Sequence, residues 1–249
     1  MIEIERRGRV AMLRMAHGKA SALDLEFCRA LGERFRGLAA DPAAAFVLTG
    51  TGGIFSAGVD LPRLRDGRDA DLREFLEAME GMFGALVRVP KPVVAAVNGH
   101  AIAGGCLLAL GCDRRLLAEG RATMGVSELR VGVPFPPVAL EILRAATAPA
   151  AFRSLVLLGE ARGTEAALRD GLADESCPPE ALPDRAAAEA ERLAAIPPVA
   201  FALAKRQLFE GVLRTLGDAP ASSAEVRAAW AAPEVRRAVA AFVERTLRR

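Results

Sequence analysis

The fold is decided by two glycine-rich stretches, Gly50-Thr-Gly-Gly-Ile-Phe-Ser-Ala-Gly-Val-Asp-Leu61 and Asn98-Gly-His-Ala-Ile-Ala-Gly-Gly-Cys-Leu107. Each follows a short apolar run, 45–49 or 93–97, that predicts a buried strand of a parallel sheet. The second stretch passes through paired glycines into a small, apolar helix. A strand that ends in such a turn presents free N–H groups at the positive end of a helix, which suits them to hold negative charge on an oxygen.

Neither stretch contains a known phosphate-binding motif. After Gly50 and Gly52, the third position of a dinucleotide-binding fingerprint is occupied by Phe55, and no Gly-Lys-Ser/Thr follows to make a P-loop. Taken alone, each stretch could be a structural turn or a site of close backbone packing. The sequence therefore excludes the common nucleotide-binding motifs here.

The surrounding pattern predicts an α/β core followed by helices. Two alternating runs, 2–5 and 10–15, predict a hairpin, and 23–39 has apolar residues at helical spacing. A second amphipathic helix at 72–86 lies between the two apolar runs, as in a strand–helix–strand unit of a parallel sheet. From Pro136 onward almost the whole pattern is helical, with Gly and Pro breaks. We expect a core at 1–196 and a helical region at 197–249.

Composition narrows the functional classes. The 33 basic and 31 acidic residues leave a net charge of +2, which predicts no nucleic-acid or anionic-membrane partner. No stretch reaches the ~18 uninterrupted apolar residues of a membrane span. The four cysteines form no CxxC pair and lie in apolar or loop contexts, as reduced thiols do. A soluble, cytoplasmic protein is expected.

Together, the two stretches resemble the crotonase (enoyl-CoA hydratase/isomerase) superfamily. Residues 55–61 match F-[SA]-[AG]-G-x-D-[LI], and 98–105 match N-G-x-[AC]-x-G-G-[GA] with one shift in glycine placement. Lys19-Ala-Ser-Ala-Leu resembles the family's [KR]-x-N-[AS]-[LM], with Ser21 where Asn is usual. Further matches at 91–99, 166–174 and 204–208 extend the resemblance over essentially the whole chain.

The resemblance implies a ββα spiral core with a C-terminal helical trimerisation region, and hence a homotrimer or homohexamer. It implies an acyl-CoA substrate and no separate cofactor, because coenzyme A is part of the substrate. The backbone N–H groups of Ala57 and Gly104 would hold the thioester oxygen as an enolate develops. Asp60 and Asn98 would hold their loops through side-chain to backbone bonds. The implied substrate-binding residues are Lys19, Ala20, Phe55, Ser56, Val59, Asp60, Leu61, Leu107, Val133 and Phe135.

Glu128 is the candidate acid/base. The segment Val126-Ser-Glu-Leu-Arg-Val-Gly132 resembles the family's P-E-x-x-x-G, in which the glutamate moves the proton, with Ser127 in place of proline. Its apolar neighbours predict a carboxylate whose pKa is raised by desolvation, as suits a group that takes a proton from carbon. The alternative is a solvated charge on a loop.

The missing second carboxylate selects the reaction. Hydratases of the family place a second glutamate where this chain has Leu107, and dienoyl-CoA isomerases place a carboxylate where it has Phe135-Pro136-Pro137. One acid/base suffices to move a proton from C2 to C4, so the pattern favours conversion of 3-enoyl-CoA to 2-enoyl-CoA. A hydratase or a thioester hydrolase of the same family, and a non-catalytic acyl-CoA-binding protein, remain alternatives.

Other residues are weaker candidates. The only histidines, His17 and His100, have no metal-ligand spacing and are expected in loops, so no metal site is expected; His100 is also a candidate pocket-lining residue. No G-x-S-x-G elbow exists for a serine hydrolase, and Ser56 has no visible base. A set of four basic residues could bind the coenzyme's phosphates or form a solvated face. These residues are Lys19, Arg63, Arg65 and Arg68.

Overall fold

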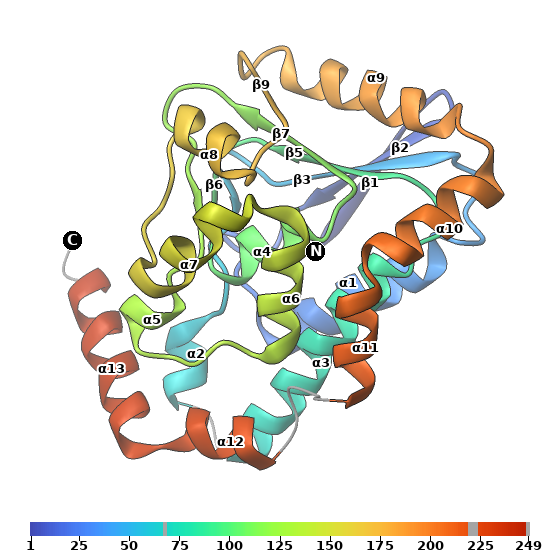
Figure 1. The fold of residues 1–249 in the computed structure, drawn as a ribbon. Helices are drawn as coiled ribbons and strands as arrows, with labels where there is room; N and C mark the ends of the chain where they lie inside the picture. Colours follow the sequence, from blue (N-terminus) through green and yellow to red (C-terminus); the bar gives the residue numbers. More distant parts are fainter. Residues whose placement is uncertain (67–68, 219–223, 248–249) are drawn as a thin grey trace.

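The structure is a computed structural model that describes residues 1–66, 69–218 and 224–247. A six-stranded sheet, ordered β1-β2-β3-β5-β7-β9, forms the centre of this part of the chain, with α9 on one face and α1 and α3 on the other (Figure 1). Its strands are parallel except for the β1–β2 hairpin. The strands are β1 (Ile2–Arg7), β2 (Val10–Met15), β3 (Ala45–Thr49), β4 (Ile54–Ser56), β5 (Val93–Val97), β6 (His100–Ile102), β7 (Arg114–Ala118), β8 (Met124–Gly125) and β9 (Glu175–Cys177).

Helices account for most of the remaining chain. They are α1 (Leu25–Gly37), α2 (Leu61–Asp66), α3 (Asp69–Val87), α4 (Gly104–Leu110), α5 (Glu128–Val131), α6 (Pro137–Ala146), α7 (Pro149–Leu158), α8 (Thr164–Asp170), α9 (Leu182–Ala194), α10 (Pro198–Leu208), α11 (Glu210–Asp218), α12 (Ala224–Ala231) and α13 (Pro233–Leu247). In the described ranges, each helix is too short or too polar to cross a membrane.

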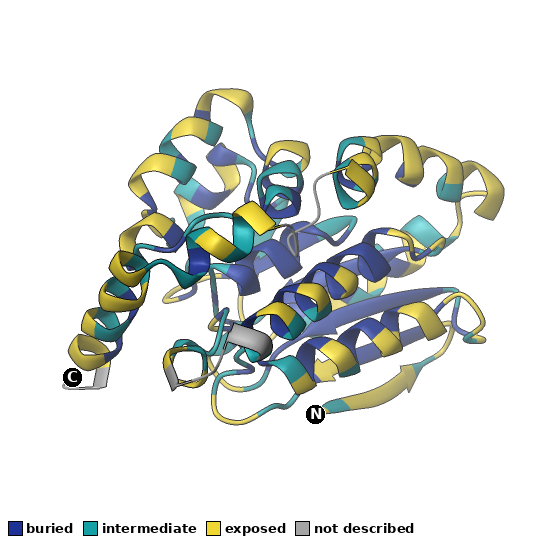
Figure 2. Ribbon diagram, turned by 90° about the horizontal axis from the view of Figure 1, so that it is seen from below, coloured by how far each residue is buried: buried dark blue, intermediate teal, exposed yellow. Residues whose placement is uncertain are grey.

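Helix α1 shows how local sequence sets an element. It begins after Asp24, whose Oδ1 accepts a hydrogen bond from the N–H of Phe27 at 2.8 Å, and so starts two residues later than its apolar pattern predicts. The predicted apolar face, including Phe27, Leu31 and Phe35, is fully buried. Figure 2 shows the buried sides of α1 and α3 turned to the sheet and their exposed sides turned to solvent.

A second, three-stranded sheet, β4-β6-β8, carries the two glycine-rich stretches. Strand β4 comes from the first stretch and pairs in parallel with β6 from the second, so that Ile54 lies opposite His100. The sequence predicted these segments only as turns, because strands of three residues or fewer are too short to show a period. Their pairing brings the two stretches side by side.

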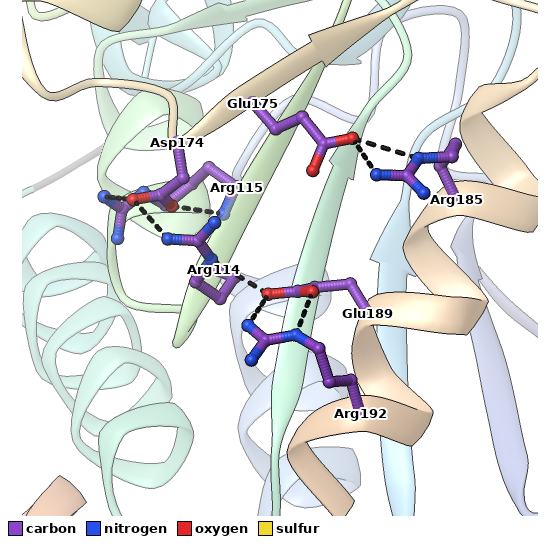
Figure 3. Close-up of polar contacts among 7 residues, drawn as sticks. All are labelled: Arg114, Arg115, Asp174, Glu175, Arg185, Glu189 and Arg192. Carbon is purple, nitrogen blue, oxygen red and sulfur yellow. Dashed lines mark hydrogen bonds and ion pairs between the residues drawn. The ribbon is translucent and has the colours of Figure 1, made fainter.

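Strand β9 (Glu175–Cys177) is an exception within a region that is otherwise almost entirely helical after Pro136, as expected. Asp174 precedes this strand, and its Oδ2 accepts a hydrogen bond from the N–H of Arg115 on β7 at 2.7 Å. Its Oδ1 accepts from Nη2 of Arg115 at 3.0 Å. Figure 3 shows this contact beside two ion pairs from α9, Arg185 with Glu175 and Glu189 with Arg114. The motif at 166–174 therefore anchors the sheet edge.

The C-terminal helices are attached to the core by a buried ion pair. Nζ of Lys205 on α10 lies 2.8 Å from Oδ2 of Asp113, and both side chains are almost wholly buried. Helices α12 and α13 then lie against α2, α3 and α5 (Figure 1). They bury Trp230, Val239 and Val243 within the same chain.

Candidate active site

A cavity of about 90 Å³ lies between the glycine-rich stretches and the C-terminal helices. Among its described lining residues, Glu128 carries the only ionisable side chain, and nearly all the others are apolar. The cavity is lined by Ala57, Val59, Leu61, Met79, Phe83, Ile102, Ala103, Gly104, Leu107, Ser127, Glu128, Val131, Val133, Pro136, Ala139, Trp230 and Phe242. Such a lining excludes water and strengthens any electrostatic interaction inside it.

The two glycine-rich stretches touch through their backbones. A Cβ on Gly58 would lie 2.6 Å from the carbonyl oxygen of Ile102 and 3.1 Å from the nitrogen of Gly104. A Cβ on Gly105 would lie 2.3 Å from the carbonyl oxygen of Ser56. Gly58 also has a φ of +78°. Only glycine permits this approach, which brings the residues around Gly58 against the start of α4.

Ala103 takes an unusual backbone conformation at the start of α4. Its φ of +51° lies in the region that favours glycine, and it stands where the family resemblance expects the first of its glycines. Its own N–H donates to the carbonyl oxygen of Gly125 at 2.8 Å. Such a conformation costs roughly 1–3 kcal/mol and persists where its surroundings impose it, often at a functional site. Ala103 turns the chain into α4, whose first N–H group belongs to Gly104.

The prediction that Ala57 supplies a free N–H group is wrong. Its N–H donates to the carbonyl oxygen of Ala20 at 3.0 Å. Val59 differs, because the hydrogen bonds to Leu23 are made by its neighbours: the Gly58 carbonyl accepts from Leu23 N–H at 2.7 Å, and Asp60 N–H donates to the Leu23 carbonyl at 3.0 Å. Val59 and Leu23 are the partners of an isolated parallel β-bridge. Because the neighbours of Val59 make the hydrogen bonds of this bridge, the N–H of Val59 itself points away from Leu23.

Two unpaired N–H groups therefore lie at the cavity wall. Among the described residues, the N–H of Val59 has no backbone or side-chain acceptor, and the N–H of Gly104 lies in the first turn of α4, where no intrahelical acceptor exists. Both residues line the cavity. The sequence could not show which of Val59 and Ala57 has the free N–H group. Two residues apart in a regular strand, their N–H groups would point the same way, but the positive φ of Gly58 between them interrupts this regularity.

Glu128 is buried and faces the cavity, so its alternative assignment as a solvated loop charge is wrong. It begins α5, its side chain is 6% exposed, and its Oε2 finds no hydrogen-bond partner among the described residues. Burial raises the pKa of Glu128 to about 7, while the backbone N–H groups of Glu128 and Ser127 act in the opposite direction. A carboxyl group with this pKa can take up and return a proton near neutral pH.

Leu107 lines the same cavity as Glu128. Its side chain is 2% exposed and lies on α4, one turn after Gly104. A leucine can neither orient a water molecule nor donate a proton. Among the described lining residues, Glu128 is therefore the sole proton carrier that the side chains provide.

The other predicted substrate-binding residues divide into two groups. Val59, Leu61 and Val133 line the cavity together with Leu107. The others do not line it, and they are Lys19, Ala20, Phe55, Ser56, Asp60 and Phe135.

The residues outside the cavity have identifiable positions. Phe55 and Ser56 are fully buried, and Oγ of Ser56 donates to the carbonyl of Ser21 at 2.7 Å. Lys19 is exposed, and Ala20 supplies the carbonyl that occupies the N–H of Ala57. Asp60 lines a neighbouring hollow that shares Val59 with the cavity. Of these residues, Ala20 and Ser56 support the loop beside the cavity through these hydrogen bonds.

The predicted loop-holding residues do hold their loops. Oδ1 of Asn98 accepts a hydrogen bond from the N–H of Gly50, and its Nδ2 donates to the carbonyl of Gly52, each at 2.8 Å. Oδ1 of Asp60 accepts from the N–H of Arg63 at 3.1 Å. These bonds fix the ends of the first glycine-rich stretch.

The histidines and arginines make structural contacts. Nε2 of His17 lies 2.8 Å from Oδ2 of Asp24, an oxygen that also accepts from Arg63 at 2.6 Å. His100 opens β6 instead of lying in a loop, and its Nδ1 lies 2.8 Å from Oγ1 of Thr123. No group of three potential metal ligands gathers within the described ranges. Arg65 is exposed, and Arg68 lies outside the described residues.

The sequence missed the far wall of the cavity. Met79 and Phe83 come from α3, Trp230 from α12 and Phe242 from α13. Each lies in a helix whose apolar pattern indicates burial, but a pattern does not distinguish a core position from a cavity wall. Their only shared signal is hydrophobicity, so the fold alone brings them together.

Comparison with known proteins agrees with this geometry. The sequence profile of the enoyl-CoA hydratase/isomerase family matches residues 5–248. The chain belongs to this family. A putative enoyl-CoA hydratase of Thermus thermophilus is 35% identical to this family member over 215 residues, which is 84% of this chain and 83% of that protein.

Solved structures of other family members share the fold. The human mitochondrial delta3-delta2-enoyl-CoA isomerase superimposes with a TM-score of 0.93 at 27% identity, covering 99% of this chain and 98% of that chain. The probable enoyl-CoA hydratase EchA3 of Mycobacterium tuberculosis H37Rv has a TM-score of 0.81 at 28% identity, covering 98% and 96%. The expected crotonase-like α/β fold with a helical C-terminal region is thereby confirmed.

The raised pKa of Glu128 predicts a pH-dependent change in stability. The folded carboxyl group keeps its proton to about pH 7, whereas the unfolded one loses it near its ordinary value of 4.5, so the free energy of unfolding falls as pH rises between these values. Glu128→Gln removes this loss. At pH 8 this substitution should raise the free energy of unfolding by an amount on the order of 3 kcal/mol, and the thermal midpoint by several degrees. At pH 4.5 it should change both quantities little.

Thermal unfolding of both proteins at the two pH values measures this difference. Glu77→Gln, an exposed position on α3, is the matched control and should shift neither midpoint. An equal effect of Glu128→Gln at both pH values would contradict the buried, protonated carboxyl group.

Proposed function

We propose that this family member moves a double bond in an acyl-CoA thioester, converting a 3-enoyl-CoA to a 2-enoyl-CoA. One observation carries the proposal: a single buried carboxylate, Glu128, shares an apolar cavity with two unpaired backbone N–H groups. This arrangement supplies one proton carrier and one site for negative charge on oxygen. A shift of a double bond needs no more than these two.

The proposed reaction has two steps. Ionised Glu128 removes a proton from C2, and the electron pair of that C–H bond delocalises into a dienolate whose oxygen accepts hydrogen bonds from the N–H groups of Val59 and Gly104. The protonated Glu128 then returns the proton to C4, which re-forms the thioester carbonyl and leaves the double bond between C2 and C3. Two such donors in a dry site can each contribute about 3 kcal/mol to the developing oxyanion.

Hydration is the second candidate, because the Thermus relative bears the name of a putative hydratase. Addition of water across a double bond requires that the water be oriented as it loses its proton. Leu107 occupies the position from which the family's second glutamate would do this, and it cannot. A thioester hydrolase meets the same difficulty. A non-catalytic binding protein would gain nothing from burying a carboxylate, which costs stability.

The proposal requires no cofactor beyond the coenzyme A of the substrate. We also propose a cytoplasmic location, which is supported by four buried cysteines that form no disulfide.

Replacement of the proton carrier should abolish turnover. Glu128→Gln keeps the shape of the side chain but cannot accept a proton, so kcat on 3-hexenoyl-CoA should fall by at least about a thousandfold while thioester binding changes little. In the wild type, kcat/KM should rise tenfold per pH unit below about pH 7 and level off above it, because the ionised carboxylate is the active form. Unchanged turnover in the variant would remove Glu128 from the mechanism.

Restoration of the missing carboxylate tests the choice between isomerase and hydratase. Leu107→Glu should create weak hydratase activity on crotonyl-CoA, because a second carboxylate could then share a water with Glu128. Isomerase turnover should fall, since like charges raise each other's proton affinity. The gain should be small because the surrounding shell is apolar. Leu107→Gln is the matched control without the charge. Ready hydration of crotonyl-CoA by the wild type would overturn the isomerase assignment.

We propose that the protein forms a trimer or a dimer of trimers. Large apolar side chains are exposed on α10, where Val199 is 83% and Leu208 is 62% exposed, and also on α7, at Leu157. Light scattering should give the mass of three or six chains, and Val199→Glu should lower it, because a buried interface does not tolerate an unpaired charge. An exposed position on α9, Glu191→Gln, serves as control. A monomer at micromolar concentration would contradict the proposal.

A further inference from the structure

Leu23 contacts both backbone segments that carry the unpaired N–H groups. Its own N–H donates to the carbonyl oxygen of Gly58 at 2.7 Å, and its carbonyl oxygen accepts from the N–H of Asp60 at 3.0 Å. These two hydrogen bonds hold the residues on either side of Val59. Because they are made by the backbone of Leu23, they position the N–H of Val59 independently of the side chain at residue 23.

The side chain of Leu23 contacts the residue that carries the second N–H group. A Cβ placed on Gly104 would lie 2.9 Å from Cδ1 of Leu23, and 3.9 Å from both Cα of Gly58 and Cγ2 of Val59. The Leu23 side chain is also wholly buried. It therefore packs directly against the first residue of α4, and this contact supports the N–H of Gly104 from below the helix end.

The residue after Leu23 ties it to the core. Oδ1 of Asp24 accepts a hydrogen bond from the N–H of Phe27 at 2.8 Å and so caps α1. Its Oδ2 lies 2.8 Å from Nε2 of His17 and accepts from Nη1 of Arg63 at 2.6 Å. Leu23 is thus anchored at one end by α1 and contacts both donor segments with its own backbone and side chain.

We propose that Leu23 is the positioning residue of the candidate active site, which fixes the separation between the N–H groups of Val59 and Gly104. This inference rests on the proposed function, in which those two groups hold the thioester oxygen. Leu23 is not among the described residues that line the cavity, so it acts through the two donors and not on the substrate. Stabilisation of an oxyanion depends on such fixed donor geometry, since a displacement of roughly half an ångström weakens a hydrogen bond.

Substitution of Leu23 should lower kcat more than it changes KM. Leu23→Ala keeps both backbone hydrogen bonds but removes the atoms that pack against Gly104, so the first turn of α4 gains room to move. We expect kcat on 3-hexenoyl-CoA to fall by about tenfold or more, with KM changed by less than about twofold. Leu23→Met keeps a side-chain atom at the δ position and should retain most of the turnover.

A thioester that cannot react gives a second readout. Butanoyl-CoA, isotope-labelled at the carbonyl carbon, has no double bond to move, and its infrared C=O stretch should fall in frequency when two N–H groups bind the oxygen. In Leu23→Ala at least about half of this shift should be lost, because one of the two donors is displaced. The shift reports on the donors without involving Glu128 as a proton carrier.

Leu31→Ala is the matched control. Leu31 is an equally buried leucine on α1, and it is not among the described residues that line the cavity. Both substitutions leave a void in the core and should lower the thermal midpoint. Only Leu23→Ala should change kcat and the carbonyl shift when both variants are measured well below their midpoints. If Leu23→Ala does not fold, Leu23→Val, which also lacks δ atoms, takes its place.

A second substitution can refill the space that Leu23→Ala leaves. Alone, Gly104→Ala should displace the Leu23 side chain, since the new methyl group would lie 2.9 Å from Cδ1. In the Leu23→Ala background the same methyl group would meet Gly58 and Val59 at 3.9 Å, an ordinary contact distance. The double variant should therefore retain more of the carbonyl shift than Leu23→Ala alone. Independent effects of the two substitutions would contradict the contact.

Unchanged kcat and carbonyl shift in Leu23→Ala, or an equal loss in Leu31→Ala, overturns the inference. The outcome is separable from that of the proposed function. If Glu128→Gln retained full turnover while the carbonyl shift depended on Leu23, the double-bond shift would be wrong and the positioning role would stand. If Glu128→Gln lost turnover and Leu23→Ala kept both readouts, only this inference would fail. An unshifted carbonyl in the wild type would overturn both.

Discussion

The site depends on the backbone contact between residues 56–58 and 102–105. No side chain could be inserted at Gly58 or Gly105, because a Cβ at either would collide with a carbonyl oxygen of the opposite stretch. This contact fixes the position of α4 relative to the loop that contains Val59, and so brings two unpaired N–H groups to one cavity wall. Side chains flex, but backbone held in this way is organised before a substrate arrives, which is the condition for electrostatic stabilisation of a developing charge.

Glu128 supplies the complementary constraint. Its carboxyl group is held in an apolar cavity without a charged partner, and this desolvation raises its pKa to about 7. The same burial lowers the free energy of unfolding at neutral pH. This loss of stability accompanies a carboxyl group that can exchange a proton near neutral pH. Leu107, which lines the same cavity, adds no second charge beside this carboxylate. The chemistry available to the site depends on both residues: Glu128 provides one carboxyl group that can carry a proton, and Leu107 has no second such group.

The C-terminal helices serve the site as well as the outer surface. The buried pair of Lys205 and Asp113 anchors α10 to the core, and α12 and α13 return to the cavity. Trp230 and Phe242 close its far wall, so part of the cavity lining comes from the segment of the chain most distant in sequence from the glycine-rich stretches. The exposed apolar side chains of α10 lie on the same C-terminal segment.

The sequence by itself determined the family resemblance, the parallel core strands, the apolar face of α1 and the role of Asn98, because each depends on local spacing or on a short motif. It also identified Glu128 and Leu107 through motif positions. Only the tertiary structure decided that Val59, and not Ala57, offers a free N–H group, because the direction of an amide after the positive φ of Gly58 depends on its partners in space. The short strands β4, β6 and β8 and the wall formed by Trp230 were equally beyond local patterns, since both arise from contacts between segments far apart in the chain.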